Sequence, residues 1–176
     1  KAVDNLETSW KNSQKNPEVL IALSNAKVRL EQQRANEQHT TPPIVKTIAM
    51  LIPVSARISE RSMPIGFLAA VGEAQRAWNN TRHDWLLQTI VGNDENDPNI
   101  ANKNVVKQII DRRSIIGTVG PYSSHVAKGI LPTYTRNKMT LISGTSTSID
   151  LGRVAATPAR APWSILCSVS PRSRPI

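Results

Sequence analysis

The sequence predicts an α/β fold, an open parallel sheet with helices on both faces, preceded by a short helical segment. Between residues 44 and 151, runs of apolar and β-branched residues alternate with segments whose apolar residues recur at helical spacing. Such alternation implies right-handed crossovers between parallel strands. The chain has 176 residues, of which 39% are hydrophobic and only 4% aromatic. This composition is sufficient for one sizeable core, which must be aliphatic.

The first 40 residues are predicted to be helical. Asn16, Pro17 and Glu18 form a helix start, because asparagine caps a helix, proline suits its first turn and an acid complements its dipole. The aliphatic residues that follow give a broad apolar face, which an earlier helix around Val3 to Trp10 could cover. We interpret the pair as a helical spacer before the main domain. The alternative is the edge of a tetratricopeptide-like array.

A linker is predicted after these helices. The stretch from Glu31 to Pro43 is polar and ends in Pro-Pro, which is typical of a connection between structured segments. We therefore assign residues 1–40 to the helical segment, residues 41–46 to the linker and residues 47–151 to the main domain.

Four strands and three helices are predicted in and just before the main domain. The first strand, Ile44 to Val54, is a continuous apolar run typical of a strand that is buried on both faces. The later elements are helix 63–80, strand 85–92, a helix that starts at Asp97 and Pro98, strand 114–120, a helix from Ser123 to Asn137, and strand 139–143. We expect the strands in the order 2-1-3-4. Ligands bind beyond the carboxyl ends of the strands in open sheets of this kind.

The carboxyl-terminal stretch departs from this pattern. Residues 152–176 contain four arginines, no acidic residue and no clear period. We expect this Arg/Pro/Ser-rich tail to lie outside the sheet or to be poorly packed. The chain also starts at Lys1 with no initiator Met and no signal peptide. We therefore expect a fragment of a longer protein.

The composition argues against nucleic-acid binding and against a membrane span. The net charge is +9, but no cluster of Lys and Arg is interleaved with aromatic residues, so nucleic-acid binding is not expected. The longest apolar run, Ile48 to Val54, is far too short to cross a bilayer. One cysteine and three scattered histidines exclude an intrachain disulfide and give no spacing for metal ligands.

The common enzyme motifs are missing. No GxGxxG follows the first strand, and neither GxxxxGK[ST] nor GxSxG occurs. Asp94, Glu95 and Asp97 are interpreted as a solvated acidic turn in which Asp97 caps a helix, with a metal or acid–base site as the alternative. His125 lies beside two serines, but no acid completes a triad. No catalytic residue, cofactor or metal site is therefore expected, although a flavodoxin-like or hydrolytic domain stays open as an alternative.

Two hydroxyl-rich loops stand at the expected binding edge. In GPYSSH, Ser123 and Ser124 begin a helix, whose free N–H groups and dipole favour an anion. In SGTSTS, residues 143–148, hydroxyl side chains directly follow the fourth strand. The expected strand order makes the two loops neighbours, with donors for a carboxylate and carbonyl acceptors for an ammonium, which predicts a zwitterion site. The alternative is that Ser123 only caps the helix and that the Ser/Thr run is only a turn.

These loops and the strands before them resemble the leucine/isoleucine/valine-binding protein family. Its members are type I periplasmic substrate-binding proteins of amino-acid ABC transporters, related to receptor ligand-binding regions. The segments that carry the resemblance are Val119–Ser148, Thr47–Ser55, Ile65–Asn79 and Gly92–Ala101. The resemblance implies that the chain holds the amino-terminal lobe of a protein with two lobes.

The resemblance also implies a set of site residues and a function. Ser124, with Ser123 beside it, would bind the carboxylate of the ligand. The main-chain carbonyl of Thr145 would bind the ammonium, and Thr147 would add a hydroxyl. The implied function is binding of an amino acid, branched-chain-like, without enzymatic activity or a cofactor. An ABC-transporter permease would be the partner of the full-length protein, at a periplasmic or extracytoplasmic location. The alternative, favoured by residues 1–40, is a ligand-sensing domain of a signalling protein fused to helical repeats.

Overall fold

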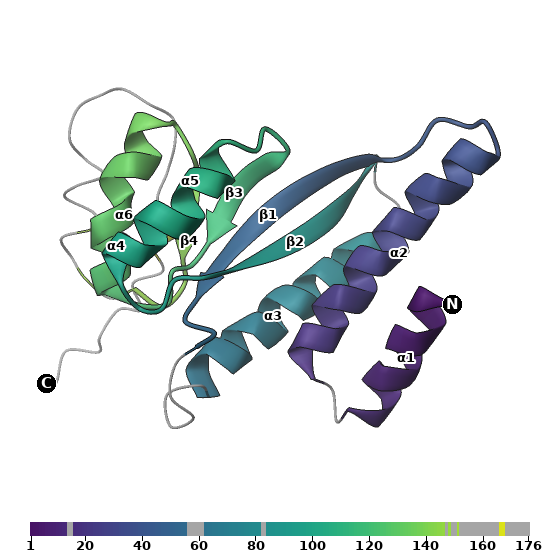
Figure 1. The fold of residues 1–176 in the computed structure, drawn as a ribbon, viewed down its shortest axis with the longest axis horizontal. Coiled ribbons are helices and arrows are strands. Elements are labelled where there is room, and N and C mark those ends of the chain that lie inside the picture. The colour runs from purple at the N-terminus through teal and green to yellow at the C-terminus, as the bar shows by residue number, and fades with distance from the viewer. Residues whose placement is uncertain are drawn as a thin grey trace, which may run out of the picture. The chain divides into compact units, whose positions relative to one another are not determined.

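The structure is a computed structural model, which describes residues 1–13, 16–55, 62–81, 84–146, 148, 151 and 166–167. The chain forms two compact units (Figure 1). The first unit contains residues 1–48 and 57–90, and the second contains residues 49–56 and 91–176. The first unit thus joins the amino-terminal helices to residues 57–90, whereas the sequence analysis separates the two by a linker.

The sheet confirms the predicted order 2-1-3-4. Within the described residues it has five strands in the order β2-β1-β3-β4-β5. Strand β4 pairs in parallel with β3, with Leu141 opposite Thr118. The strands are β1 (Ile44–Ile52), β2 (Trp85–Asn93), β3 (Ile115–Val119), β4 (Leu141–Ser143) and β5 (Leu166–Cys167).

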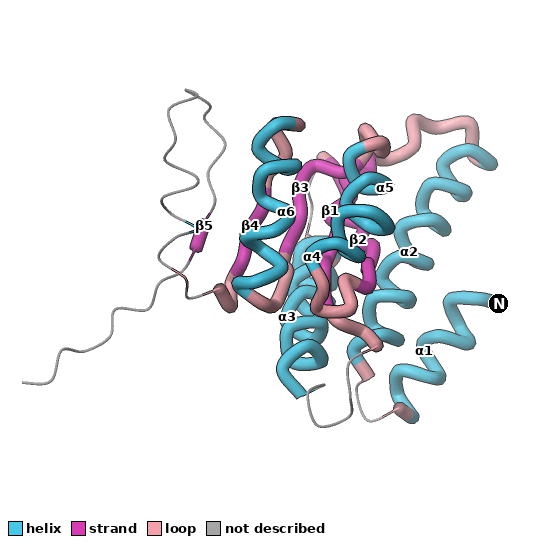
Figure 2. The backbone as a smooth tube through the Cα atoms, turned by 60° about the vertical axis from the view of Figure 1, so that its left-hand side comes forward, coloured by secondary structure: helices cyan, strands magenta, loops and turns pink. Residues whose placement is uncertain are grey.

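Strand β5 corrects the expectation for the tail. Leu166 and Cys167 pair in parallel with Ile142 and Ser143 of β4 (Figure 2), so the prediction that residues 152–176 lie outside the sheet is wrong for these two residues. Without β5, β4 would present a row of unpaired N–H and C=O groups, which an extended segment of almost any sequence can pair with. The other residues of the tail lie outside the described residues.

Three helices make up most of the first unit: α1 (Ala2–Asn12), α2 (Pro17–Glu37) and α3 (Ser62–Asn79). Helix α2 begins as predicted, because Oδ1 of Asn16 accepts a hydrogen bond of 2.9 Å from the N–H of Glu18. It packs against α1 on one side and α3 on the other. A Cβ added at Gly72 of α3 would lie 3.2 Å from the side chains of Leu20 and Ile21, so the two helices approach closely there.

The interpretation of residues 31–43 as a connection is wrong for residues 31–37, which continue helix α2 and lie within the helical segment assigned to residues 1–40. Most of these residues are good helix formers, and Gln33 Nε2 donates to Oε1 of Glu37 one turn later at 2.7 Å. Ala35 is buried, so this turn also packs against the rest of the unit. The polar stretch at residues 31–37 is therefore a helical segment in which most side chains are exposed and Ala35 is buried.

In the second unit the helices alternate with the strands along the chain, as predicted. One helical stretch consists of α4 (Pro98–Ile100), a π-helical segment η2 (Ala101–Val106) and α5 (Lys107–Ile110), and a second is α6 (Ser124–Arg136). Asp97 caps α4 as expected, because its Oδ1 accepts from the N–H of Asn99 at 2.7 Å. Asn102 Nδ2 donates to the carbonyl of Gly129 at 3.0 Å, which ties the two helical stretches together. The π-helical segment was not predicted.

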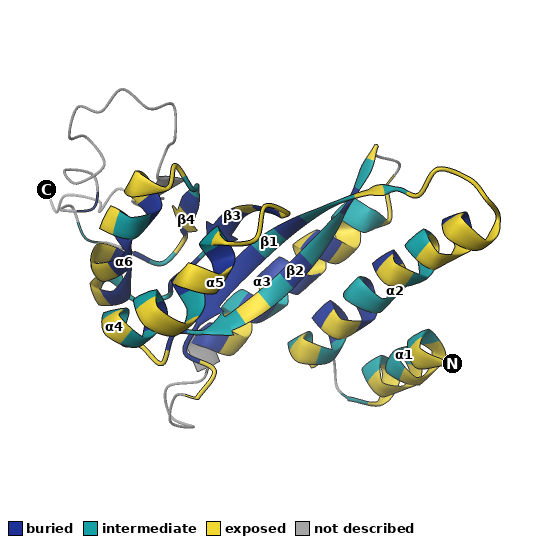
Figure 3. Cartoon of the chain, turned by 45° about the horizontal axis from the view of Figure 1, so that its top comes forward, coloured by how far each residue is buried: buried dark blue, intermediate teal, exposed yellow. Residues whose placement is uncertain are grey.

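Helix α6 covers the second unit with an aliphatic face. Figure 3 shows its inner side as buried and its outer side as exposed. The phenol of Tyr134 is 0% exposed and makes a 2.9 Å hydrogen bond with the hydroxyl of Thr118 on β3. Its other fully buried residues are Val126, Ala127, Ile130 and Leu131. This packing fixes the start of α6 relative to the carboxyl ends of β3 and β4.

Candidate functional site

The structure brings the two hydroxyl-rich loops together in the second unit. The hydroxyl of Ser143 donates to the carbonyl of Pro121 at 3.2 Å, and that of Thr145 donates to the carbonyl of Tyr122 at 2.7 Å. The loop after β4 is therefore attached to the loop after β3 through side-chain to main-chain hydrogen bonds. The predicted neighbourhood of the two loops is observed.

A close approach of the main chain also shapes this edge. Gly120, directly after β3, has a φ of +100°, a main-chain conformation that residues other than glycine rarely adopt. A Cβ at this position would collide with the carbonyl oxygen of Leu51 on β1. Glycine at residue 120 is therefore required for the loop to leave β3 beside the end of β1.

At the start of α6, main-chain N–H groups lack partners within the helix. Ser123 is the N-cap, and its Oγ accepts a hydrogen bond of 3.2 Å from the N–H of Val126. The structure therefore shows the capping role that the sequence left as an alternative for Ser123. In the first turn of a helix the leading N–H groups, here those of Ser124 and His125, have no partner within the helix. Together with the helix dipole, they favour an anion.

Ser124 is positioned by a residue that the sequence analysis did not single out. The hydroxyl of Ser146, which is 1% exposed, donates to Oγ of Ser124 at 2.7 Å. Since Ser124 uses its oxygen as the acceptor, its own hydrogen stays available for a further acceptor. The sequence signal for Ser146 was the SGTSTS run, in which the burial of one particular hydroxyl cannot be read from the letters.

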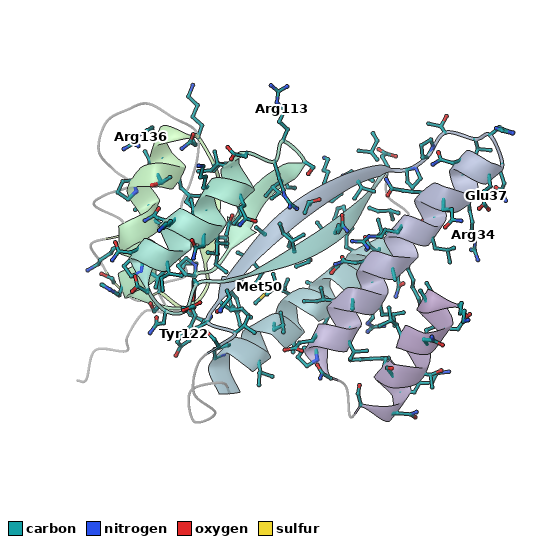
Figure 4. All side chains as sticks on the ribbon, in the orientation of Figure 1. Arg34, Glu37, Met50, Arg113, Tyr122 and Arg136 are labelled. Carbon is teal, nitrogen blue, oxygen red and sulfur yellow. The ribbon has the colours of Figure 1, made fainter. Side chains whose placement is uncertain are left out.

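The structure describes one of the two threonines that were predicted to bind the ligand, Thr145, but not the other, Thr147. The Thr145 side chain is half-buried and is bonded to the carbonyl of Tyr122, so its hydroxyl is used within the protein. Its proposed contribution was the main-chain carbonyl, which this side-chain hydrogen bond leaves unused. Thr147 lies outside the described residues. Figure 4 shows Tyr122 at one end of the second unit and Arg113 and Arg136 at the other, so these two cations are remote from the hydroxyl loops.

The acidic turn after β2 contains one buried carboxyl group. Asp94 is 1% exposed, and its Oδ1 accepts a hydrogen bond of 2.9 Å from the N–H of Asn96. Burial raises the pKa of this carboxyl, and the hydrogen bond from Asn96 opposes the shift. The interpretation as a solvated turn is therefore wrong for Asp94, although it holds for Glu95, which is exposed. Asp94 closes the turn through its side chain, which requires the carboxyl to point inward.

Neither metal-binding nor membrane-spanning features occur in the described part of the chain. No group of three or more His, Cys, Asp or Glu side chains there could hold a metal ion. None of the helices in these ranges combines the length and apolar character that crossing a bilayer requires.

The first unit contains a cavity of about 290 Å³ among its helices. Trp10, Leu20 and Leu86 contribute apolar surface to it, and the ion pair between Lys27 Nζ and Glu7 Oε1, 2.8 Å long, lies at its lining. None of the predicted ligand-binding residues lines this cavity. The hydroxyl loops have the donors and acceptors that recognition of a zwitterion requires, so we regard them as the candidate site.

A parallel sheet of this order, covered by helices and carrying its polar loops at the carboxyl ends of β3 and β4, is the fold of a periplasmic-binding-protein lobe. Similar solved structures are an ABC transporter substrate-binding protein from Desulfitobacterium hafniense, also solved in complex with Leu, and the branched-chain amino acid transporter substrate binding protein LivJ from Streptococcus pneumoniae in complex with isoleucine. The TM-scores are 0.51 for the first two and 0.52 for the third, at 17% sequence identity.

The matches cover 62% of this chain and 31% of each of those chains. The matched part of the chain thus corresponds to about a third of the length of these proteins. These structural matches confirm the fold that the sequence resemblance implied. No protein-family model and no curated protein matches the sequence.

Proposed function

We propose that the chain contains a solute-binding module for an amino acid with an aliphatic side chain, or for a zwitterion of similar size. The observation that carries this proposal is the 2.7 Å hydrogen bond from Ser146 to Ser124. It holds Ser124 at the start of α6 with its hydroxyl hydrogen free, beside main-chain N–H groups that also lack partners within the helix. Donors that converge in this way fit a carboxylate.

The ammonium half of the ligand would meet the loop after β4. The main-chain carbonyl of Thr145 is the proposed acceptor, because its side chain is already bonded to the carbonyl of Tyr122. Thr147 is proposed to add a hydroxyl. The two kinds of group on the two loops would bind the two ends of a zwitterion, and the sheet fixes their separation.

The chemistry of this edge supports binding rather than catalysis. The partner of the Ser124 hydroxyl is another hydroxyl, and the partner of the Thr145 hydroxyl is a main-chain carbonyl. Activation of a serine for attack requires a hydrogen-bonded base such as histidine, which neither hydroxyl has in these contacts. We therefore propose a non-enzymatic module.

In the full-length protein a second lobe would complete the site. The solved structures named above are about three times as long as the part of them that this chain matches. We propose that the second lobe supplies further contacts and excludes water, that an ABC-transporter permease is the partner, and that the location is extracytoplasmic. Binding by this chain alone is then expected to be weak, with a Kd on the order of 1 mM.

A second candidate function is a ligand-sensing domain of a signalling protein. The observation that favours it is the packing of α2 against α3 within the first unit, which attaches the amino-terminal helices directly to a helix of the predicted main domain. A helix that is packed in this way could transmit a change in the domain to segments that precede it.

The test is a titration that separates the two ends of the ligand. Leucine, 4-methylpentanoate (the carboxylate without the ammonium) and 3-methylbutylamine (the amine without the carboxylate) would each be titrated into the chain and followed by NMR. We expect leucine to bind more tightly than either half-ligand. Ser124→Ala should weaken leucine and 4-methylpentanoate about 10- to 150-fold, as the loss of one charge-assisted hydrogen bond predicts, and leave the amine unchanged.

Thr135→Ala is the matched control, because Thr135 is an exposed hydroxyl near the other end of α6. It should leave all three titrations unchanged. The proposed function is contradicted if Ser124→Ala binds leucine as the parent chain does, or if no ligand with a carboxylate shifts resonances of the two loops.

A further inference from the structure

Strand β2 is an edge strand whose own sequence carries neither charge nor proline to protect the edge. Among the described residues, it has β1 on one side and no strand on the other. Its sequence, WLLQTIVGN, contains no charged residue and no proline. Natural edge strands are commonly kept from pairing with other chains by lysine, proline or a bulge. An uncharged stretch rich in aromatic and β-branched residues is typical of segments that pair with their own kind.

Two asparagine side chains occupy the outer edge of this strand. Asn79 Nδ2 donates to the carbonyl of Leu87 at 2.8 Å, and its Oδ1 accepts from the N–H of Leu87 at 2.8 Å. Asn25 makes the same pair of hydrogen bonds with Thr89, at 2.8 Å to the carbonyl and 3.1 Å from the N–H. A carboxamide has the donor and the acceptor of a peptide group, so each asparagine takes the place of one residue of a neighbouring strand.

The two asparagines act at successive positions of one edge. Leu87 and Thr89 are two residues apart, so their peptide groups point to the same side of the strand. Gln75 Nε2 joins the two sites, since it donates to Oδ1 of Asn25 at 2.8 Å and to the carbonyl of Leu87 at 3.0 Å. Trp78 Nε1 donates to the carbonyl of Trp85 at 3.3 Å, which extends the occupied edge to the start of the strand.

The contact is not arranged for stability alone. Oε1 of Gln75 and Oγ1 of Thr89 are buried and have no hydrogen-bond partner in the part of the chain that the structure describes. A buried polar atom without a partner destabilises the folded state. Apolar side chains between α2 and β2 would avoid this cost, but they would leave the peptide groups of Leu87 and Thr89 open. The polar network occupies these peptide groups instead.

We propose that the outer edge of β2 is a latent strand-addition site, closed by the carboxamides of Asn25 and Asn79, and that the partner it fits when opened is β2 of a second copy of this chain. A second copy is the fitting partner because the strand is uncharged and carries no group that would repel its equivalent. Helix α2 then has a function in this fold besides covering the core. It positions the Asn25 side chain against the peptide groups of Thr89 on the edge strand.

The test is the double substitution Asn25→Ala/Asn79→Ala in the full chain, studied by size-exclusion chromatography with light scattering over a range of concentrations. We expect the parent chain to stay monomeric and the variant to form dimers or larger species, with at least a tenfold rise in the associated fraction at the highest concentration. Thioflavin T fluorescence would report strand pairing between copies.

Two further variants separate edge opening from loss of stability. Val28→Ala removes a buried side chain of α2 and leaves the hydrogen bonds of Asn25 and Asn79 to β2 in place, so it should lower the melting temperature without causing association. Val91→Lys places a charge at a residue of β2 that is 42% exposed, and on the double-variant background it should restore the monomer. The proposal is overturned if the double variant stays monomeric, or if Val28→Ala associates to the same extent.

Hydrogen exchange keeps the proposal testable if the double variant does not fold. The amide of Thr89 should be protected in the parent chain and should exchange at least tenfold faster in Asn25→Ala, while the amide of Thr118 on β3, which donates to the carbonyl of Thr140 at 2.9 Å, stays protected. A Thr89 amide that exchanges freely in the folded parent chain would overturn the proposal directly.

Discussion

The hydroxyl of Ser146 lies 2.7 Å from that of Ser124, although the two serines are 22 residues apart in the chain. Ser146 follows β4, and Ser124 begins the helix after β3. This hydrogen bond joins the two loops at the carboxyl ends of neighbouring strands. It also sets the direction in which the Ser124 hydroxyl can donate.

The first prediction concerns Ser146→Ala. This change removes the donor that orients Ser124 but no group that is proposed to touch the ligand. We expect leucine affinity to fall by about 2- to 12-fold, the effect of one neutral hydrogen bond, which is less than for Ser124→Ala. NMR titration of the two variants side by side measures this difference. An equal or larger loss in Ser146→Ala would show that Ser146 itself binds the ligand.

The second prediction compares two glycines. Gly120→Ala places a Cβ against the carbonyl of Leu51 at a residue whose φ is +100°, so we expect a loss of about 2–4 kcal/mol in the free energy of unfolding. Gly66→Ala adds a Cβ to α3 with no atom within 4 Å, so we expect a gain of about 0.5–1 kcal/mol. Urea denaturation measures both. The account of the β3 loop fails if Gly120→Ala is as stable as the parent chain.

The third prediction concerns the pH dependence that Asp94 contributes. Burial raises its pKa above 3.8, the usual value for an aspartate carboxyl, so the folded protein binds this proton more tightly than the unfolded chain does. The stability from protonation is complete below pH 3.8 and is lost as the pH rises through the folded-state pKa. Asp94→Asn keeps the acceptor for the Asn96 N–H and removes the charge. We expect it to be more stable than the parent at pH 7.

Denaturation curves at several pH values test this expectation. The difference between Asp94→Asn and the parent should shrink as the pH falls toward 3.8. Glu95→Gln is the control, because Glu95 is the exposed neighbour in the same turn. A stability difference for Asp94→Asn that is constant between pH 4 and pH 7 would argue against a buried, titrating carboxyl.

The fourth prediction concerns alkaline pH. Burial raises the pKa of Tyr134 from 10.0 to about 12, and the hydrogen bond to Thr118 opposes the shift. The unfolded chain loses this proton first, so the stability is complete below pH 10 and is lost as the pH rises toward 12. Tyr134→Phe should lower stability at pH 7 by about 1 kcal/mol, because the Thr118 hydroxyl loses its partner.

The same variant should show a flatter decline between pH 10 and pH 12 than the parent chain. Circular dichroism at 222 nm during urea titration at each pH measures both slopes. If the two chains lose stability in parallel over this range, Tyr134 is not the group whose titration destabilises the second unit.

The sequence by itself determined the elements whose causes are local. The caps at Asn16, Asp97 and Ser123 bond to main-chain groups two or three residues away, so the letters around each helix start contain the whole interaction. The alternation of strands and helices predicted a parallel sheet with right-handed crossovers, and the order 2-1-3-4 expected for it is the one observed. The neighbourhood of the loops at residues 120–124 and 143–148 followed from that order.

Only the tertiary structure decided the contacts whose partners are far apart in the chain. Asn25 bonds to Thr89, which is 64 residues away, so the sequence around α2 could not show that this helix closes an edge strand. The same holds for Ala35, whose burial makes residues 31–37 a packed helix rather than a linker, and for β5, which pairs with β4. Asp94 and Ser146 are polar residues in loops, and their burial depends on main chain that lies elsewhere in the sequence. Periodicity reports which face of a segment is apolar, but which polar groups are enclosed is settled only when the segments pack, because hydrogen bonds act over a few ångströms in space and not along the chain.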